Sequence, residues 1–392
     1  MDTTSIGRPD NDFIQDVLGL GGEDLKKCYQ CAACTSACSL STEQNGFPRK
    51  EMLMAQWGMK DRTIEDPGPW LCYYCGDCSK VCPRKANPGE TMMALRRYLT
   101  SYYDWTGLSR RMYRSGIWEI GFLLLMAAVV IALFTLPHGF GFDLLARSGP
   151  APLTHVMLDR FAPVAIAHRA DQILALFLAV FLLSNAARMY FFLTRGRKIP
   201  VGLYFTYLPV FALHGLTQIR WKSCGSAETT KNWLRHLFLV TGYATMFLLV
   251  VIFLPWFQVQ NNSFHWTSFL GYYATAVLLI ATTWILIDRV RKQDEIYRYS
   301  HISDWLFPIL LFLTALSGIL LNVLRLMDLP MPTYVLYTVH WAIAAPMLIV
   351  EVPFGKWAHL IYRPLAIYLA AVRNKAEELS AEKKVDLSEM VA

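Results

Sequence analysis

Apolar and polar positions separate along this chain into a polar front, a long apolar middle and a charged end. Charged residues are dense in 1–116 and 373–392, and long apolar runs lie between them. Runs of about 20 residues or more can cross roughly 30 Å of hydrocarbon as helices. The predicted spans are 117–136, 170–193, 233–256, 267–288, 304–326 and 333–354. The pattern therefore predicts an all-α chain with a six-helix transmembrane domain.

The loops between these spans predict their orientation. Lysine and arginine gather in the loops after the second and fourth spans, whereas 257–266 carries no charge and 327–332 carries only Asp328. Because basic residues favour the cytoplasmic side, we expect both termini in the cytoplasm and the chain in the cytoplasmic (inner) membrane. The chain also opens without the apolar segment of a signal peptide.

A further apolar segment, 200–217, is interrupted by Gly202, Pro209 and Gly215. As a seventh span it would invert the topology and place the basic loop at 289–298 outside, against the charge rule. We therefore expect an interfacial or a re-entrant helix at this position.

Composition agrees with a membrane protein. The 392 residues are 54% hydrophobic and 17% charged, which is too apolar for an ordinary soluble domain. The net charge of +7 is concentrated beside the apolar runs. There it indicates membrane orientation and contact with lipid, not binding to nucleic acid.

Eight of the nine cysteines form two runs, Cys28–Cys38 and Cys72–Cys82, each with the spacing C-x2-C-x2-C-x3-C. A [4Fe-4S] cluster takes four thiolates, and in two-cluster ferredoxins the last cysteine of each run ligates the other cluster. The expected ligands are Cys28, Cys31, Cys34 and Cys82 for one cluster, and Cys72, Cys75, Cys78 and Cys38 for the second. Structural zinc is the alternative, but zinc usually takes four ligands as two separated pairs.

Helical periodicity surrounds the cysteine runs. After the second run, Met92, Leu95 and Leu99 fall on one helical face. This favours a helical two-cluster domain over a compact β-type ferredoxin. Arg96 and Arg97 are expected near anionic lipid headgroups.

Histidines near the span ends predict haem ligands. His340 and His359 are 19 residues apart, or about 28 Å of helix, so one helix could present a ligand near each membrane face. The two rings would differ in direction by about 100° around an ideal helix. A kink or local unwinding at Pro346 or Pro353 would absorb this difference.

Each of these histidines needs a partner at matching depth. His236 is expected to pair with His359, and His168 with His340. Two axial imidazoles fill the coordination positions of the iron, which suits electron transfer. The alternatives for His168 are His138, His155 and His265, and His214 is a reserve ligand.

These motifs resemble known proteins. The paired cysteine runs resemble the C subunit of heterodisulfide reductase. The C-terminal stretch is similar to the last helix of the nitrate reductase gamma subunit and the heterodisulfide reductase E subunit; it reads "HWAIAAPMLIVEVPFGKWAHLIYRPLAIYL". A fusion of these halves resembles the membrane subunit of the quinone-interacting membrane-bound oxidoreductase complex of sulfate reducers. The chain departs from the gamma-subunit pattern at Met246, where a second histidine is expected.

The resemblance implies three parts: a cytoplasmic di-cluster ferredoxin domain at 1–110, a transmembrane dihaem cytochrome b domain at 111–365, and a charged cytoplasmic tail at 366–392. It implies b haems held through His236, His340 and His359, and menaquinone as the substrate of a quinone-reactive oxidoreductase subunit. It also implies two soluble partners that carry flavin and Fe-S clusters and resemble heterodisulfide reductase A. A link to adenylylsulfate reductase in dissimilatory sulfate reduction follows as well.

Quinone chemistry moves protons, so titratable groups are expected near its site. Glu351 is an intramembrane carboxylate, for which an ion pair with Lys356 or Arg363 is the alternative. Asp171 and Arg169 lie close to His168 in the sequence. Two alternatives remain for the whole chain. One is a haem-free, membrane-anchored ferredoxin, and the other is the membrane subunit of a heterodisulfide- or fumarate-type reductase.

Overall fold

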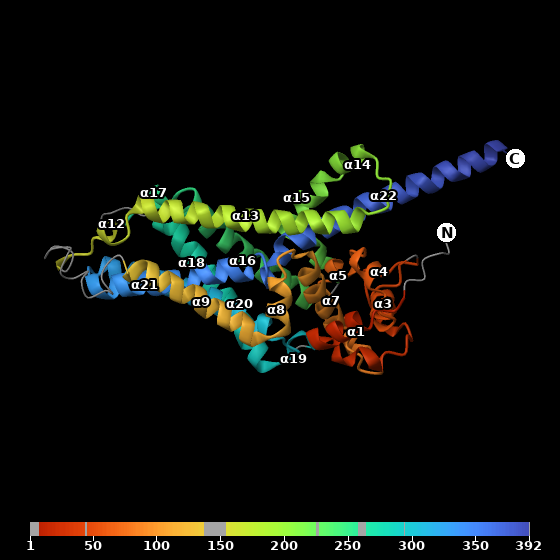
Figure 1. Ribbon diagram of the computed structural model, residues 1–392, viewed down its shortest axis with the longest axis horizontal. Helices are drawn as coiled ribbons and strands as arrows, with labels where there is room; N and C mark the ends of the chain where they lie inside the picture. Colours follow the sequence, from red (N-terminus) through yellow and green to blue (C-terminus); the bar gives the residue numbers. More distant parts are fainter. Residues whose placement is uncertain are drawn as a thin grey trace.

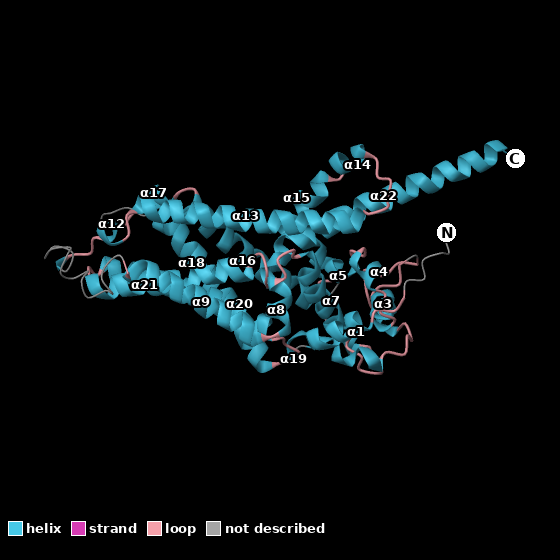
Figure 2. Cartoon of the chain, in the orientation of Figure 1, coloured by secondary structure: helices cyan, strands magenta, loops and turns pink. Residues whose placement is uncertain are grey.

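The computed structural model describes residues 8–43, 45–136, 154–224, 227–257, 264–293 and 295–391. Within these ranges the chain is helical and contains no strand (Figure 2). The all-α prediction is therefore confirmed.

Six helices are long and apolar enough to cross a membrane. They run side by side along the long axis of the molecule, and the N-terminal helices gather at one end (Figure 1). Their bounds are α9 (Gly116–Thr135), α13 (Val164–Thr194), α16 (Ala227–Val251), α18 (Ser268–Arg291), α20 (Ile302–Leu326) and α21 (Pro330–Glu351). The number of spans is the predicted one, and the bounds differ from the prediction by a few residues.

The N-terminal domain is built from short helices around one longer helix, α7. They are α1 (Asn11–Val17), α2 (Ala33–Ser36), α3 (Arg49–Gln56), α4 (Lys60–Ile64), α5 (Gly68–Leu71), α6 (Asp77–Lys80), α7 (Pro88–Tyr103) and α8 (Leu108–Arg114), with a π-helical turn at Leu18–Gly22 and a 3-10 turn at Glu23–Lys27. Met92, Leu95 and Leu99 of α7 are fully buried, as their periodicity predicts. The Asn87 side chain accepts a hydrogen bond from the backbone N–H of Glu90 and so caps this helix.

Shorter elements connect the long helices. They are α12 (Leu158–Phe161), α14 (Val201–Thr206), α15 (Leu208–Thr217), a 3-10 turn at Ile219–Cys224, α17 (Leu254–Phe257), α19 (Glu295–Arg298), a 3-10 turn at Lys356–Ala358, and α22 (His359–Val391). The apolar segment 200–217 forms α14 and α15, which contact α22 and are too short to span. Phe205 and Leu216 there are 73% and 72% exposed, which is consistent with a helix pair at the membrane surface.

His340 and His359 lie on different helices. Helix α21 ends at Glu351 and α22 begins at His359. The backbone leaves the α-helix between them at Pro353 and Gly355, where a 3-10 turn follows. A break at this point allows the two rings to take directions that a straight helix would not permit.

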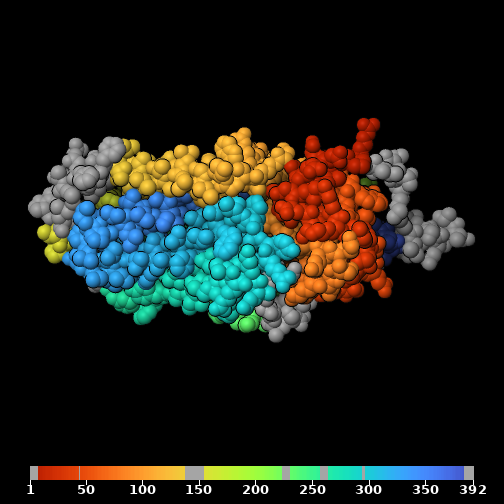
Figure 3. Space-filling model, turned by 90° about the horizontal axis from the view of Figure 1, so that it is seen from below, coloured from red at the N-terminus to blue at the C-terminus, as the bar shows by residue number. Residues whose placement is uncertain are grey.

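The N-terminal domain is joined to the membrane helices through a shared core. Met189 and Leu193 from the end of α13 and Tyr362 and Leu369 from α22 belong to the same buried cluster as Phe13. Figure 3 shows this domain, in red and orange, packed directly against the cyan start of α20. The region expected as a charged tail from residue 366 therefore begins as part of a core.

Arg96 and Arg97 correct a prediction. Both were expected near lipid headgroups, but they are 7% and 3% exposed. Arg97 binds Glu90 at 2.7 Å and Asp304 of α20 at 2.9 Å. A helical residue is directed by its face as well as by its place in the sequence, and α7 turns these two toward protein.

Candidate functional site

The two cysteine runs fold in the same way. Gln30 and Tyr74 occupy equivalent places after the first cysteine and have φ of 59° and 57°. Ala32 and Gly76 follow the second cysteine with φ of 67° and 86° and precede the short helices α2 and α6. Alternation of left- and right-handed residues forms the concave backbone found around Fe-S sites. The runs are therefore two copies of one local structure, and α2 contacts α6.

The last cysteine of each run lies beside the other run. Burial raises the pKa of the Cys38 thiol to about 11, the Leu40 N–H opposes this, and the nearby Cys72 and Cys75 thiols add to it. Burial also raises the pKa of the Cys28 thiol, and Cys82 of the second run is one of its neighbours. Cys38 and Cys82 therefore each lie near thiols of the other run.

Hydrogen-bond donors surround the sulfurs. The backbone N–H of Tyr74 donates to Cys72 Sγ at 3.3 Å, and that of Ala86 donates to Cys82 Sγ at 3.3 Å. Such donors stabilise thiolates and tune the potential of a cluster. Within the described ranges, no three His, Cys, Asp or Glu side chains converge as a single metal ion requires.

The surroundings of the two runs differ. Cys31 of the first run is exposed, whereas Cys72 and Cys78 of the second run are buried. The backbone carbonyl of Cys72 accepts hydrogen bonds from two guanidinium groups, those of Arg96 and, at 3.1 Å, Arg363 of α22. Burial lowers the pKa of Arg96 to about 9, and the neighbouring Arg363 adds to this effect. Positive charge is therefore concentrated at the second run.

His236 and His359 face each other at the end of the membrane helices. Their ring centres are 6.2 Å apart. Imidazole binds metals at about 2 Å, so two rings that share one metal have centres roughly 6 Å apart. His359 Nδ1 lies 2.6 Å from the carbonyl oxygen of Lys356, which leaves Nε2 free to ligate. Burial, reinforced by Arg363, lowers the pKa of His359 well below its ordinary value, and the neutral ring is the ligating form. The residues present fit a bis-imidazole haem.

Aromatic contacts join this histidine pair to the second cysteine run. The Tyr73 ring stacks on Trp221 with centres 5.5 Å apart, and Trp221 lies 5.3 Å from His236. The Arg363 guanidinium lies 4.7 Å above the Tyr73 ring. Tyr73, Trp221 and Arg363 were not among the predicted site residues, because nothing in their local sequence shows that they meet.

The structure does not bring His168 and His340 into ring contact among the described residues. His340 Nδ1 lies 2.9 Å from Ser317 Oγ, and the absent side chain of Gly318 leaves open the space beside the ring. His168 lies 3.0 Å from the amide of Gln172 on its own helix. Among the alternatives, His155 contacts Asp328 and His265 contacts Thr267, His214 lies on α15, and His138 lies outside the described residues.

The residues expected to handle protons lie in different places. Glu351 is fully buried at the end of α21 and accepts a hydrogen bond at 3.3 Å from the backbone N–H of Lys356. Asp171 is 6% exposed, whereas Arg169 is exposed and donates to its own helix at Ala165. Glu119, a buried carboxylate in α9, was not predicted, although it carries the same intramembrane signal as Glu351.

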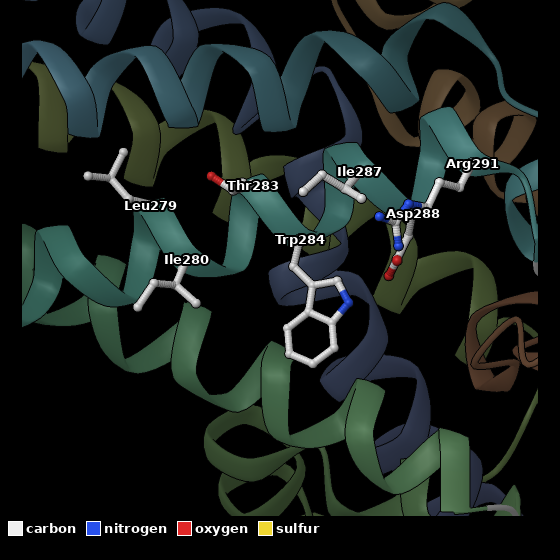
Figure 4. A pocket seen from close by; sticks show the side chains of 7 residues that line it. All are labelled: Leu279, Ile280, Thr283, Trp284, Ile287, Asp288 and Arg291. Carbon is white, nitrogen blue, oxygen red and sulfur yellow. The ribbon is translucent and has the colours of Figure 1, made fainter.

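A shallow groove follows the outer face of α18 (Figure 4). Its lining is Leu279, Ile280, Thr283, Trp284, Ile287, Asp288 and Arg291. One helix supplies the whole lining, none of the predicted site residues belongs to it, and Asp288 is already bound to Arg235 at 2.7 Å. The groove therefore does not displace the cysteine and histidine site.

Comparison with known proteins supports the assignment of the N-terminal domain. Residues 24–86, which include all eight clustered cysteines, match the family described as "4Fe-4S dicluster domain". The front of this chain is a 4Fe-4S dicluster domain. Its spacing and its repeated backbone structure are those that two clusters require.

Curated relatives share part of the chain. A protein of Archaeoglobus profundus, named as similar to the C subunit of heterodisulfide reductase, is 37% identical over 109 residues, which is 28% of this chain and 57% of that protein. The C subunit of the H(2):CoB-CoM heterodisulfide,ferredoxin reductase of Methanothermobacter marburgensis is 35% identical over 79 residues, 20% of this chain and 43% of that protein. The matches thus span about half the length of these relatives. No solved structure matches the chain.

Proposed function

We propose that this chain is a membrane electron-transfer subunit that links the menaquinone pool to soluble reductase partners. The support is the joining of a dicluster domain to six span-length helices in one chain. The relatives described above are named as heterodisulfide reductase subunits or as similar to one, so a place in a multi-subunit oxidoreductase follows by similarity.

Each cluster takes three cysteines from one run and one from the other. Cys28, Cys31, Cys34 and Cys82 hold the first [4Fe-4S] cluster, and Cys72, Cys75, Cys78 and Cys38 hold the second. The proximity of Cys38 to Cys72 and of Cys28 to Cys82 supports this crossed arrangement. Cys72 and Cys78 of the second set are buried and Cys31 of the first set is exposed, which favours a first cluster nearer to a soluble partner.

His236 and His359 are the axial ligands of one b haem, which would supply one-electron chemistry at the dicluster end of the membrane helices. His340, with its Nδ1 held by Ser317, and His168 would serve a second b haem. Quinone protons would be handled by Glu351, Asp171 or Arg169.

The observation that carries the proposal is the contact between the two cofactor sites. Tyr73 follows Cys72 directly, and its ring reaches the histidine pair through Trp221. This contact favours the order membrane histidines, second cluster, first cluster, soluble partner. Electron transfer along this route needs both the dicluster domain and the membrane helices. A ferredoxin that is only anchored by its helices would not need such a contact.

The partners follow from what the chain lacks in sequence. It contains no G-x-G-x-x-G and no Cys-Cys-Gly element, so flavin and disulfide chemistry belong to other subunits. We propose two soluble partners resembling heterodisulfide reductase A and a link to adenylylsulfate reductase in sulfate respiration. The complex would lie in the inner membrane, with both termini of this chain cytoplasmic.

The test is the reduced-minus-oxidised optical spectrum of the purified chain and of two variants. His359→Ala should lose about half of the b-haem signal and keep the cluster signals, because one of two iron sites loses an axial ligand. His155→Ala, at the opposite end of the molecule and in contact with Asp328, is the matched control and should keep both; loss of haem there would make His155 a ligand in place of His168. A wild-type chain without b haem would refute the haem assignment and favour the haem-free anchored ferredoxin. A co-purifying Cys-Cys-Gly protein would favour a heterodisulfide-type reductase.

A further inference from the structure

Two buried glutamates from different membrane helices meet at the dicluster end of the bundle. Glu119 lies in the first turn of α9 and Glu351 is the last residue of α21, and the two helices pack along each other. Glu119 is 1% exposed and Glu351 is 0% exposed. Their carboxyl groups are in hydrogen-bonding contact.

The hydrogen-bond donors around the two glutamates do not explain why their carboxyl groups lie together. Glu351 Oε2 accepts from the backbone N–H of Lys356, and Gly355 makes room for it, since a Cβ there would lie 2.4 Å from that oxygen. Glu119 Oε2 and Glu351 Oε1 are buried and have no hydrogen-bond partner among the described donors. Two ionised carboxylates in contact repel strongly in a medium of low dielectric constant. The contact is favourable when one carboxyl carries a proton and donates it to the other.

The charged groups that face the pair do not replace this proton. Arg97 of α7 and Lys356, the nearest cations, are both bound to Asp304 of α20. Arg97 also binds Glu90. Tyr113 of α8 faces both glutamates and is neutral because burial raises its pKa well above the ordinary value. Arg289 of α18 faces Asp304 and donates to Ser300.

We propose that Glu119 and Glu351 share one exchangeable proton and form a proton-binding site of the membrane domain. The pair carries a single negative charge when the proton is bound, and it binds or releases this proton without any other chemical change. The site does not depend on haem or quinone. Its use as the proton donor or acceptor beside the quinone rests on the proposed function.

The site also touches a buried ionic network that reaches the dicluster domain. From Lys356 the contacts run to Asp304, then to Arg97, then to Glu90. Glu90 accepts a hydrogen bond at 2.7 Å from the hydroxyl of Tyr74, which lies between two cysteines of the second run. A change of charge at the glutamate pair would therefore change the electrostatic potential at the second cysteine run.

The proposal is tested by infrared spectroscopy of the full-length chain in lipid nanodiscs, in H2O and in D2O. The wild-type protein should show a protonated-carboxyl C=O band that shifts in D2O. Glu119→Gln and Glu351→Gln should each remove the same component of this band, because the amide of the new side chain donates to the remaining carboxylate. Glu23→Gln, at an exposed position, and Glu51→Gln, at a buried carboxyl of the dicluster domain, should retain it.

Each other outcome contradicts the shared proton. An exchangeable carboxyl band that neither glutamine substitution reduces, or the absence of any such band in the wild-type chain, would overturn the proposal. Loss in only one variant would show a single protonated glutamate in place of a shared proton. Iron content and helical circular dichroism identify a variant that has failed to fold, and the wild-type isotope shift does not depend on any variant. The haem spectrum of the same sample reports separately on the proposed function.

Discussion

The two cysteine runs have the same spacing and the same backbone structure, yet they lie in opposite surroundings. Each has a tyrosine after its first cysteine and an arginine over that ring: Arg84 lies 4.3 Å from the Tyr29 ring, and Arg363 lies 4.7 Å from the Tyr73 ring. Tyr29 is 69% exposed, whereas Tyr73 is 4% exposed. The first pair lies at the surface and the second lies within the protein.

This difference shows what a ligand motif can and cannot specify. The spacing and the left-handed residues shape the local backbone, so both runs can hold the same kind of cluster. The contacts of the second run with α22 and Trp221 give it a neighbour in the membrane domain. Identical motifs can thus take different places in one electron path, and the following predictions test that contrast.

The largest effect is expected from exchanging the last cysteine of a run. Cys82→Ser should abolish the cluster built on the first run and leave the cluster on Cys72, Cys75 and Cys78. Cys38→Ser should do the reverse. Iron content should fall by about half in each variant, since each cube is held by four thiolates, and electron paramagnetic resonance identifies the cluster that remains. If each variant instead lost the cluster built on the run that carries its own substitution, crossed ligation would be refuted.

The next effect is a pH dependence of stability that arises in the segment between the two cysteine runs. Glu51 of α3 is fully buried, and burial raises its pKa to about 8, with Asp66 adding to the shift and Lys50 opposing it. The folded protein therefore binds a proton that the unfolded chain releases near its ordinary pKa of 4.5. The free energy of unfolding should fall as pH rises from 4.5 to 8, by up to about 1.4 kcal/mol per pH unit.

Glu51→Gln should flatten this pH dependence, because the amide does not titrate. Chemical denaturation of the wild type and the variant across this pH range, followed by loss of both clusters together, is the measurement. The exposed Glu23 provides the matched control, as Glu23→Gln should leave the slope unchanged. An unchanged slope in Glu51→Gln would place the titrating group elsewhere.

The smallest effect should separate the two tyrosine–arginine pairs. Arg363→Gln removes a buried positive charge beside the second run, and the loss of this charge favours the oxidised form of the second cluster. The midpoint potential of that cluster should fall by about 60 mV, the one-electron equivalent of a tenfold change in equilibrium. Arg84→Gln should shift the first cluster much less, because exposed charges are screened by water and salt. Redox titration followed by electron paramagnetic resonance compares them, and equal shifts would contradict the contrast in burial.

Local patterns predicted the fold better than they predicted neighbours. The six spans and the buried face of α7 at Met92, Leu95 and Leu99 follow from periodicity, and the structure confirms them. The expected place of Arg97 was wrong, because its partner Asp304 lies 207 positions away in the sequence. The haem-ligand assignments remain predictions, although the structure brings the rings of His236 and His359 close together.

The sequence by itself determined the elements whose causes are local: apolar runs long enough to span a membrane, and cysteines spaced to surround a cluster. Only the tertiary structure decided which run faces the histidine pair, and that Glu119 meets Glu351. Pro353 had already marked in the sequence the helix break that the structure shows between Glu351 and His359. The contact of Arg363 with the carbonyl of Cys72 joins residues 291 positions apart. Such contacts arise from the packing of whole helices, which no short stretch of sequence encodes.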